Sequence, residues 1–446
     1  MRLKFRGIAT SFLLLSILFV ATTYAKPIPE TLAREAVSED AGKAERAIAE
    51  LRAMGRAGLD VLFNVHAKEI SEQVANPLLP ATNEWKRVGR ALDAVSQQKD
   101  SYLSRLYWHT DFEEAKSAAR SAGKPILSLR LLGKLSEEYS CANSRFFRTI
   151  LYSNEEVSKT LREKFILHWQ SVRPAPRVTI DFGDGRKLER TLTGNSIHYV
   201  LDSAGRPLDA LPGLYGPGAF LRSLDQIESF HQSVAHSESK IVSGLSVYPR
   251  MRLNAINAAW VADTERIGGK SPEGFTVMRD PEGTPQALQI ASLARVKAVS
   301  EVSILRSMTA SSEALGNITD EAAWNKIAQL HLADARLDAR SLGLIRRQTS
   351  KAMSTNPGGT DDKIFNALVD KLQRNIALDT VRNEYLMRTK LYGWLNSDPS
   401  RNDLDLLNRK VYAELFLTPA SDPWLGLFSA DTYVALENGG LVGSVR

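Results

Sequence analysis

Apolar residues recur every three or four positions over two long parts of the chain, and this spacing predicts amphipathic helices. In the first part the pattern runs over residues 28–106 and includes Leu59 and Leu62. In the second part the same spacing appears at positions such as Ile364 and Leu368. The sequence therefore predicts an N-terminal helical region at residues 26–100 and a C-terminal all-helical domain at residues 236–446.

Between these parts, short apolar runs alternate with helical segments and Gly/Pro turns. The pattern predicts a helix over Phe112–Ala122, a strand over Ile126–Leu132 and a later strand over Ile197–Leu201. A hairpin is predicted around Gly183-Asp184-Gly185, because two strand-like runs flank this turn. Strands separated by helices pair in parallel, whereas hairpin strands pair antiparallel. Residues 101–235 are therefore expected to form an α/β domain, with a mixed sheet that has the hairpin at its edge and helices around it.

The N-terminus has the pattern of a secretion signal. Arg2, Lys4 and Arg6 precede an apolar run that ends in small residues around Ala25. A basic segment, a short apolar run and small residues before the cleavage point are the features that signal peptidase reads. The run is shorter than the roughly 20 apolar residues of a spanning helix. We therefore predict a signal peptide at residues 1–25, an exported protein that is periplasmic or secreted, and a mature chain without membrane insertion.

The charge balance and the histidines argue against two classes of ligand. Removal of the three basic residues of the signal lowers the formal net charge from +6 to +3. Lysine and arginine are interspersed with acidic residues, whereas a nucleic-acid site needs a clustered basic face. The seven histidines show no spacing typical of metal ligands. Neither nucleic acid nor a metal or other cofactor is predicted.

Cys141 is the single cysteine of the chain, so it has no partner for an internal disulfide. A lone cysteine in an exported protein is either buried and inert or a thiol that reacts with another molecule. Both interpretations are open at this point.

The central region has a characteristic order of residues. It opens with Trp108, enters its first strand through Gly123-Lys124-Pro125, and has Cys141 where the following helix is expected to begin. In this order it resembles the thioredoxin-like superfamily, particularly exported members, over less than a third of the chain. The other residues that carry the resemblance are Ala115, Ala119, Glu155, Glu156, Val157, Phe165, Val200, Leu201, Asp202, Gly205 and Gly213.

The resemblance implies a Cys-x-x-Cys motif at this helix start, where backbone N–H groups and the helix dipole stabilise a thiolate. The chain has Cys141-Ala142-Asn143-Ser144 instead. Cys141 and Ser144 are the predicted catalytic positions, with Ser144 donating a hydrogen bond to the thiolate. A serine cannot release a mixed disulfide by attacking it, so the ordinary dithiol cycle is excluded.

The superfamily also places a cis-proline opposite its active cysteines, and the matching residue here is about Ser196. Asn195 and Ser196 are predicted to provide polar contacts to a substrate or partner. A structural loop held by its own hydrogen bonds explains these two residues equally well.

Three functions are compatible with these patterns. The first is an exported thioredoxin-like protein that forms mixed disulfides through Cys141 with a protein or a small thiol, or whose thiol is sensitive to oxidation. The alternative is a noncatalytic interaction scaffold built on a degenerate thioredoxin-like domain. The third is an unrelated enzyme with its site in the C-terminal helices. The oligomeric state is not predicted.

The signal pattern generates the first testable prediction. Protein purified after export should begin at Lys26, because cleavage follows Ala25. Intact-mass spectrometry checks this, and a mass that retains Met1 would contradict it.

Overall fold

The computed structural model describes residues 28–78, 80–234, 238–270, 319–353, 360–397, 402–425 and 435–437. The predicted signal peptide at residues 1–25 lies outside this part of the chain.

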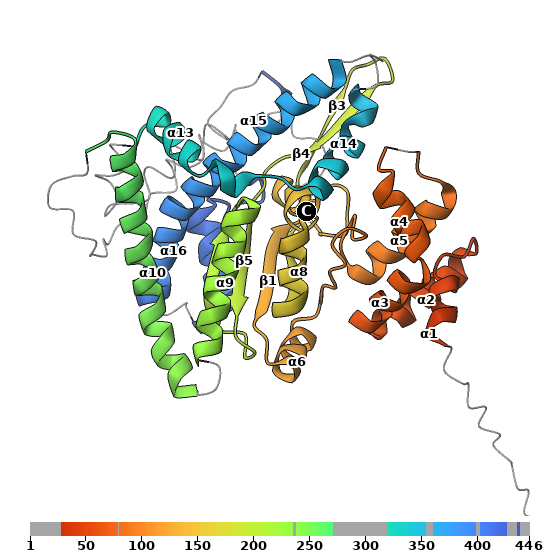
Figure 1. Ribbon diagram of the computed structural model, residues 1–446, viewed down its shortest axis with the longest axis horizontal. Helices are drawn as coiled ribbons and strands as arrows, with labels where there is room; N and C mark the ends of the chain where they lie inside the picture. The colour runs from red at the N-terminus through yellow and green to blue at the C-terminus, as the bar shows by residue number, and fades with distance from the viewer. Residues whose placement is uncertain are drawn as a thin grey trace, which may run out of the picture.

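A four-stranded mixed sheet forms the centre of the molecule (Figure 1). Its strands are β2 (Ile166–Arg173), β1 (Ile126–Leu132), β5 (Ser196–Leu201) and β6 (Pro207–Pro212), in this order across the sheet. Strand β1 pairs in parallel with β2 and antiparallel with β5, and β5 pairs antiparallel with β6. The predicted α/β class and the predicted mixed sheet with flanking helices are confirmed.

The hairpin was expected at the edge of this sheet, and that expectation is wrong. Strands β3 (Arg177–Asp181) and β4 (Lys187–Thr191) form a separate two-stranded sheet. The antiparallel part of the main sheet comes instead from β5 and β6. Strand β6 was not predicted, because proline occupies both of its ends and buried Asp209 interrupts its apolar pattern.

Helices cover both faces of the main sheet. The connection from β1 to β2 consists of α7 (Ala142–Phe146), the π-helix η1 (Phe147–Leu151) and α8 (Glu155–Lys164). Helix α9 (Pro217–Val234) packs against α8 and β6. The other face carries α6 (Phe112–Ala122), as predicted.

The C-terminal part of the chain reaches that other face as well. It contributes α17 (Leu404–Lys410) and the π-helix η6 (Val411–Leu415). Asp405 lies 3.7 Å from the guanidinium of Arg130 on β1, and the Tyr199 hydroxyl on β5 donates to Asn408. The C-terminal helices therefore complete the packing of the sheet.

The N-terminal region is helical, as predicted, and its hydrophobic core is separate from that of the sheet, although Leu344 from the C-terminal part packs into it. It lies at the right of Figure 1, on the opposite side of the sheet from α10 and α13. The side chain of Asp40 accepts from the N–H of Lys43, and Thr82 accepts from the N–H of Trp85; each fixes a helix start. Its helices are α1 (Pro29–Glu35), α2 (Ala41–Ala53), α3 (Arg56–Val65), α4 (Ala67–Ala75) and α5 (Asn83–Ser96).

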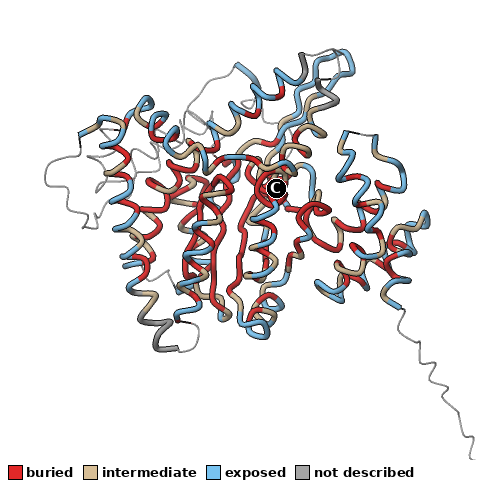
Figure 2. The backbone as a smooth tube through the Cα atoms, in the orientation of Figure 1, coloured by how far each residue is buried: buried red, intermediate tan, exposed pale blue. Residues whose placement is uncertain are grey.

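The C-terminal helices share one hydrophobic core with the sheet, from Leu106 to Leu425. Figure 2 shows the strands β1 and β5 buried along their length between the helices. The domain boundary predicted at residues 235/236 therefore falls within a continuous core. The elements of this part are α10 (Glu238–Arg266), α13 (Glu321–Leu330), η3 (Leu332–Ala335), α14 (Ala339–Met353), α15 (Thr360–Arg382), the π-helix η4 (Asn383–Arg388) and α16 (Thr389–Ser397).

An ion pair inside this core joins the sheet to the C-terminal helices. The carboxylate of Asp209 on β6 lies 2.9 Å from the guanidinium of Arg388 on η4, and both side chains are fully buried. The hydroxyls of Tyr248 on α10 and Tyr392 on α16 also donate to Asp209, each at 2.8 Å. Residues from four elements thus meet at one carboxylate.

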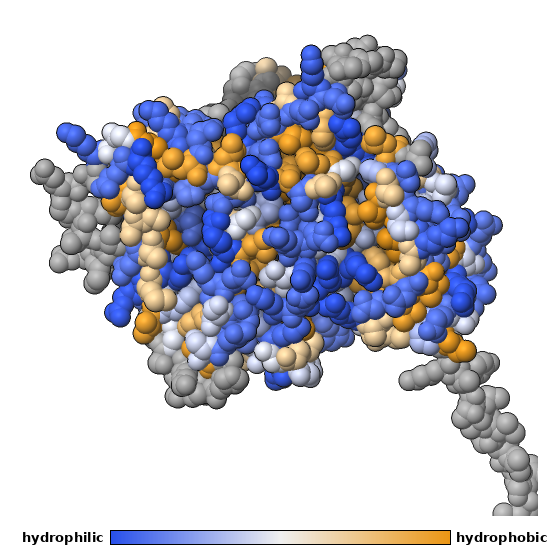
Figure 3. Space-filling view, viewed as in Figure 1, coloured by the Kyte–Doolittle hydropathy of each residue, from blue (hydrophilic) through white to orange (hydrophobic). Residues whose placement is uncertain are grey.

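The surface is largely polar. In the view of Figure 3 hydrophilic residues cover most of the face, and apolar residues form scattered groups. Among the described helices, none has the length and apolar character needed to cross a membrane.

The buried ion pair predicts a large effect of removing one partner. Arg388→Met should lower the free energy of unfolding by about 3–5 kcal/mol, because it leaves an uncompensated buried carboxylate. Urea denaturation measures this change. Arg186→Met, which removes an exposed arginine paired with Asp184, should leave the stability nearly unchanged.

Adding Asp209→Asn to Arg388→Met should recover part of the loss, because the second change removes the unpaired charge. Equal effects of Arg388→Met and Arg186→Met would contradict the role of the buried pair.

Candidate functional site

Cys141 stands immediately before α7 and caps its first turn. Its Sγ accepts the backbone N–H of Ser144 at 3.4 Å, and both residues are fully buried. The expected hydrogen bond from the Ser144 hydroxyl to the sulfur is absent. That hydroxyl donates instead to the backbone carbonyl of Cys141 at 2.9 Å, because this carbonyl lies within reach at the start of the helix.

The structure brings the predicted binding residues next to this motif. The amide of Asn143 donates to the hydroxyl of Ser196 at 2.9 Å, and the N–H of Ala142 donates to the carbonyl of Thr193 at 3.2 Å. The loop before β5 thus lies against the start of α7. None of the described peptide bonds is cis, so this loop is trans at Ser196.

Asn195 and Ser196 make their polar contacts within the chain. The side-chain amide of Asn195 donates to the hydroxyl of Thr418, and the backbone carbonyl of Asn195 accepts from the hydroxyl of Tyr412 at 3.2 Å. Both partners belong to the segment Val411–Thr418, which we call the C-terminal cover. The face predicted to receive a partner is therefore occupied by the protein's own chain.

The C-terminal cover lies close to the thiol. Burial raises the pKa of Tyr412 and of Tyr152, and proximity to Cys141 raises each further. Arg173 at the end of β2 anchors the cover by donating to the carbonyl of Thr418 at 2.9 Å. Tyr412 is buried, whereas Trp424, further along the chain, is exposed.

The charged and titratable side chains near Cys141 are hydrogen-bonded to other groups. The guanidinium of Arg148 donates to the backbone carbonyls of Glu137 and Glu138 and not to the sulfur. Burial lowers the pKa of His198 to about 3, so this imidazole is neutral at physiological pH. Its Nε2 lies 2.6 Å from the Tyr152 hydroxyl. These contacts are typical of a packed core.

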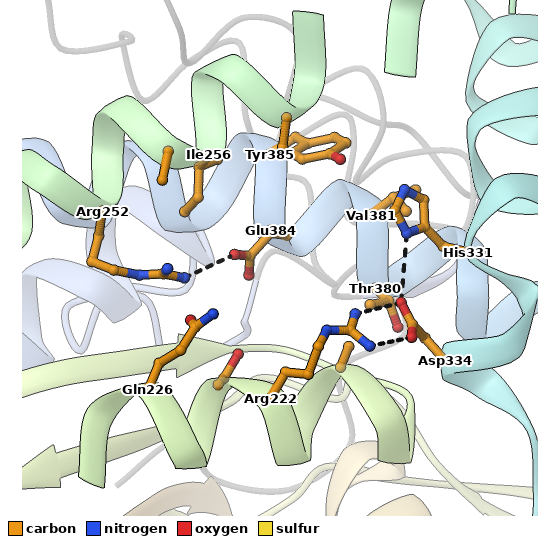
Figure 4. A pocket seen from close by; sticks show the side chains of 14 residues that line it. Arg222, Gln226, Arg252, Ile256, His331, Asp334, Thr380, Val381, Glu384 and Tyr385 are labelled. Carbon is orange, nitrogen blue, oxygen red and sulfur yellow. Dashed lines mark hydrogen bonds and ion pairs between the residues drawn. The ribbon is translucent and has the colours of Figure 1, made fainter. Parts of the chain in front are cut away.

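A second site lies among the C-terminal helices. A partly open cavity of about 230 Å³ separates α9 from α10 and is closed at its far end by η3, α15 and η4 (Figure 4). The side chains that line it are Ala219, Arg222, Ser223, Gln226, Arg252, Ala255, Ile256, Ala259, His331, Asp334, Thr380, Val381, Glu384 and Tyr385.

One side of the cavity is built around His331. Its Nε2 lies 2.6 Å from Asp263, and its Nδ1 lies 3.5 Å from Asp334. Hydrogen bonds to these two carboxylates raise the pKa of His331 to about 9, so the imidazole is cationic at neutral pH. Arg222 binds the same Asp334 through both of its terminal nitrogens.

The other side is built around Glu384, on the π-helical turn η4. Glu384 accepts from Arg388 at 2.9 and 3.1 Å, whereas Arg252 lies 3.7 Å away. The Nε of Arg252 is buried without a hydrogen-bond partner among the described residues. Single π-helical turns inside helices occur frequently at functional sites.

Close backbone packing fixes the end of the cavity at η3. A Cβ at Gly216, just before α9, would lie 2.3 Å from the carbonyl oxygen of Asp334. Only glycine permits this approach, which brings the start of α9 against η3.

Sequence reasoning missed this site because its members are spread from Ala219 to Tyr385. The sequence analysis pointed to this part of the chain only through its third function, an unrelated enzyme with its site in the C-terminal helices. Within the described part of the chain, no cluster of three or more histidine, cysteine, aspartate or glutamate residues has the geometry to hold a metal ion. Comparison with protein-family models, curated proteins and solved structures gives no match.

The raised pKa of His331 predicts a pH dependence of stability. The folded state holds the proton more tightly than the unfolded state, whose histidine pKa is about 6.5. The stabilising contribution is therefore complete below about pH 6.5 and is lost as the pH rises through about 9.

We expect this contribution to be on the order of 2 kcal/mol, after allowance for the solvent contact of the imidazole. Urea denaturation between these pH values measures it, with His331→Gln as the control that lacks the titrating group. Identical pH profiles for the wild type and His331→Gln would contradict the assignment.

Proposed function

We propose that this protein is an exported, noncatalytic binding protein in which a degenerate thioredoxin-like domain serves as the scaffold. Two features support the thioredoxin-like assignment. Cys141 begins the helix that follows strand β1, and the loop before β5 lies against that helix start. These are the relative positions that the superfamily gives to its cysteine motif and its cis-proline loop.

The burial of Cys141 is the single observation that carries the noncatalytic assignment. Thiol exchange requires a thiolate that an incoming disulfide can approach in line. The side chain of Cys141 has no exposed surface, and the C-terminal cover occupies the face beside it. Ser144 occupies the position of a resolving thiol, and it is equally buried. The motif acts as a helix cap in a closed structure.

A monothiol protein is the second candidate, and one observation favours it. The N–H of Ser144 points at the sulfur of Cys141, as it would to stabilise a thiolate. In this function the C-terminal cover must first leave, after which Cys141 forms a mixed disulfide with a protein or a small thiol. Asn195 and Ser196 then become available to the partner.

Alkylation of the native protein distinguishes the two functions. With iodoacetamide at neutral pH, Cys141 should remain unmodified in the folded protein and react only after denaturation. The matched control is the double variant Cys141→Ser with Ser121→Cys, which moves the thiol to an exposed position on α6. This control should react rapidly in the native state.

Mass spectrometry counts the modified thiols in both proteins. Native labelling of Cys141 at a rate close to that of the control, or disulfide-linked partners that disappear in Cys141→Ser, would replace the scaffold function with the monothiol function.

A further inference from the structure

The cavity between α9 and α10 has a layout that neither interpretation of Cys141 uses. It lies within the C-terminal core, and all of its lining residues come from α9 or from elements after it. One part of the lining is apolar and consists of small or branched side chains, Ala219, Ala255, Ile256, Ala259 and Val381. The other part is charged. Ligand sites commonly combine an apolar wall with a few placed polar groups.

The charges of the lining leave one positive charge in excess. Arg222, Arg252 and cationic His331 face the carboxylates of Asp334 and Glu384.

Behind the lining, the charge of Asp209 is balanced by Arg388 and that of Asp263 by Arg266. A monoanion would bring this group to neutrality, whereas a dianion would leave it negative.

Both arginines can turn to a ligand without leaving a carboxylate unpaired. Glu384 keeps its two contacts with Arg388 if Arg252 moves away, because Arg252 is the more distant cation. Asp334 likewise keeps His331 if Arg222 moves. Such a second cation behind each carboxylate lowers the cost of binding an anion.

Arg252 also interacts with the Tyr392 hydroxyl, but one of its donors has no acceptor among the described residues. Its side chain is 13% exposed, and its Nε has no hydrogen-bond partner within the described structure. A buried donor without an acceptor is unfavourable. In Figure 4 Gln226 points from α9 toward the Arg252–Glu384 pair and offers a neutral amide at the same place.

We propose that this cavity binds a small monocarboxylate with an apolar body. A planar carboxylate matches the planar guanidinium of Arg252, and the apolar body lies against Ala255, Ile256 and Val381. The volume of about 230 Å³ limits the ligand to a small organic acid. Hexanoate and benzoate have that size. This inference deepens the binding role proposed above and rests on it.

Isothermal titration calorimetry of the full mature protein tests the inference with defined probes. Sodium hexanoate and sodium benzoate are the carboxylates, hexanamide is the neutral counterpart, and inorganic phosphate is the competing anion. We expect saturable binding of at least one carboxylate, and binding of hexanamide and phosphate that is weaker by about tenfold or more.

Two variants locate the site. Arg252→Gln should weaken carboxylate binding by about tenfold or more, since it removes a charge-assisted hydrogen bond. Ala255→Leu should abolish binding by filling the cavity; residue 255 is exposed, so this change keeps the helical core intact. Arg186→Gln, on the separate hairpin, is the matched control and should bind as the wild type does.

Absence of carboxylate binding at about 10 mM, where even a Kd of about 1 mM gives near saturation, would overturn the inference. Equal binding of hexanamide or phosphate would overturn the ligand class, and unchanged binding by both pocket variants would overturn the location. Cys141→Ser should bind as the wild type does. The titrations therefore test the pocket alone, whereas the alkylation of Cys141 tests the scaffold function, so the failure of one proposal can be distinguished from the failure of the other.

Discussion

The buried pair of Asp209 and Arg388 is the interaction on which the arrangement of this protein depends. Moving two opposite charges out of water is costly, and hydrogen bonds to the remaining polar groups of the pair help their attraction to offset that cost. Tyr248 and Tyr392 supply donors to Asp209, and Glu384 and Ser223 accept from one terminal nitrogen of Arg388, whereas its Nε has no acceptor among the described residues. These residues come from α9, α10, η4 and α16. Strand β6 can therefore hold its aspartate only when those helices are in place, so the sheet and the C-terminal helices form one unit.

Both sites follow from this coupling. The C-terminal helices cross the sheet and continue into the cover, where Tyr412 and Thr418 bind Asn195 beside Cys141. The same packing leaves a cavity above the ion pair, with Arg252 beside the Glu384 that Arg388 already holds. The C-terminal helices thus lead into the cover at one place and line the pocket at another, and we propose the binding role for the pocket.

Local patterns were sufficient for the elements that bury a regular apolar face. Strand β1 and helix α6 have the bounds that their apolar patterns predicted, and the structure shows Asp111 as the cap of α6. Strand β6 could not be found in this way, because Asp209 is stabilised by groups distant in sequence. The burial of Cys141 could not be predicted for the same reason. The sequence indicated that a helix begins at Cys141, but the C-terminal cover that packs near this residue begins at Val411, far along the chain.

Hydrogen–deuterium exchange of the native protein tests most directly whether the C-terminal cover is a permanent part of the core. The amides of Phe416 and Thr418 are hydrogen-bonded within the cover, at 2.9 and 2.7 Å, and can be compared with those of strand β1. The account predicts that both sets exchange only through global unfolding, with the same dependence on denaturant. Exchange of the cover amides through a low-energy local opening, while β1 stays protected, would contradict it and leave Cys141 accessible to a partner.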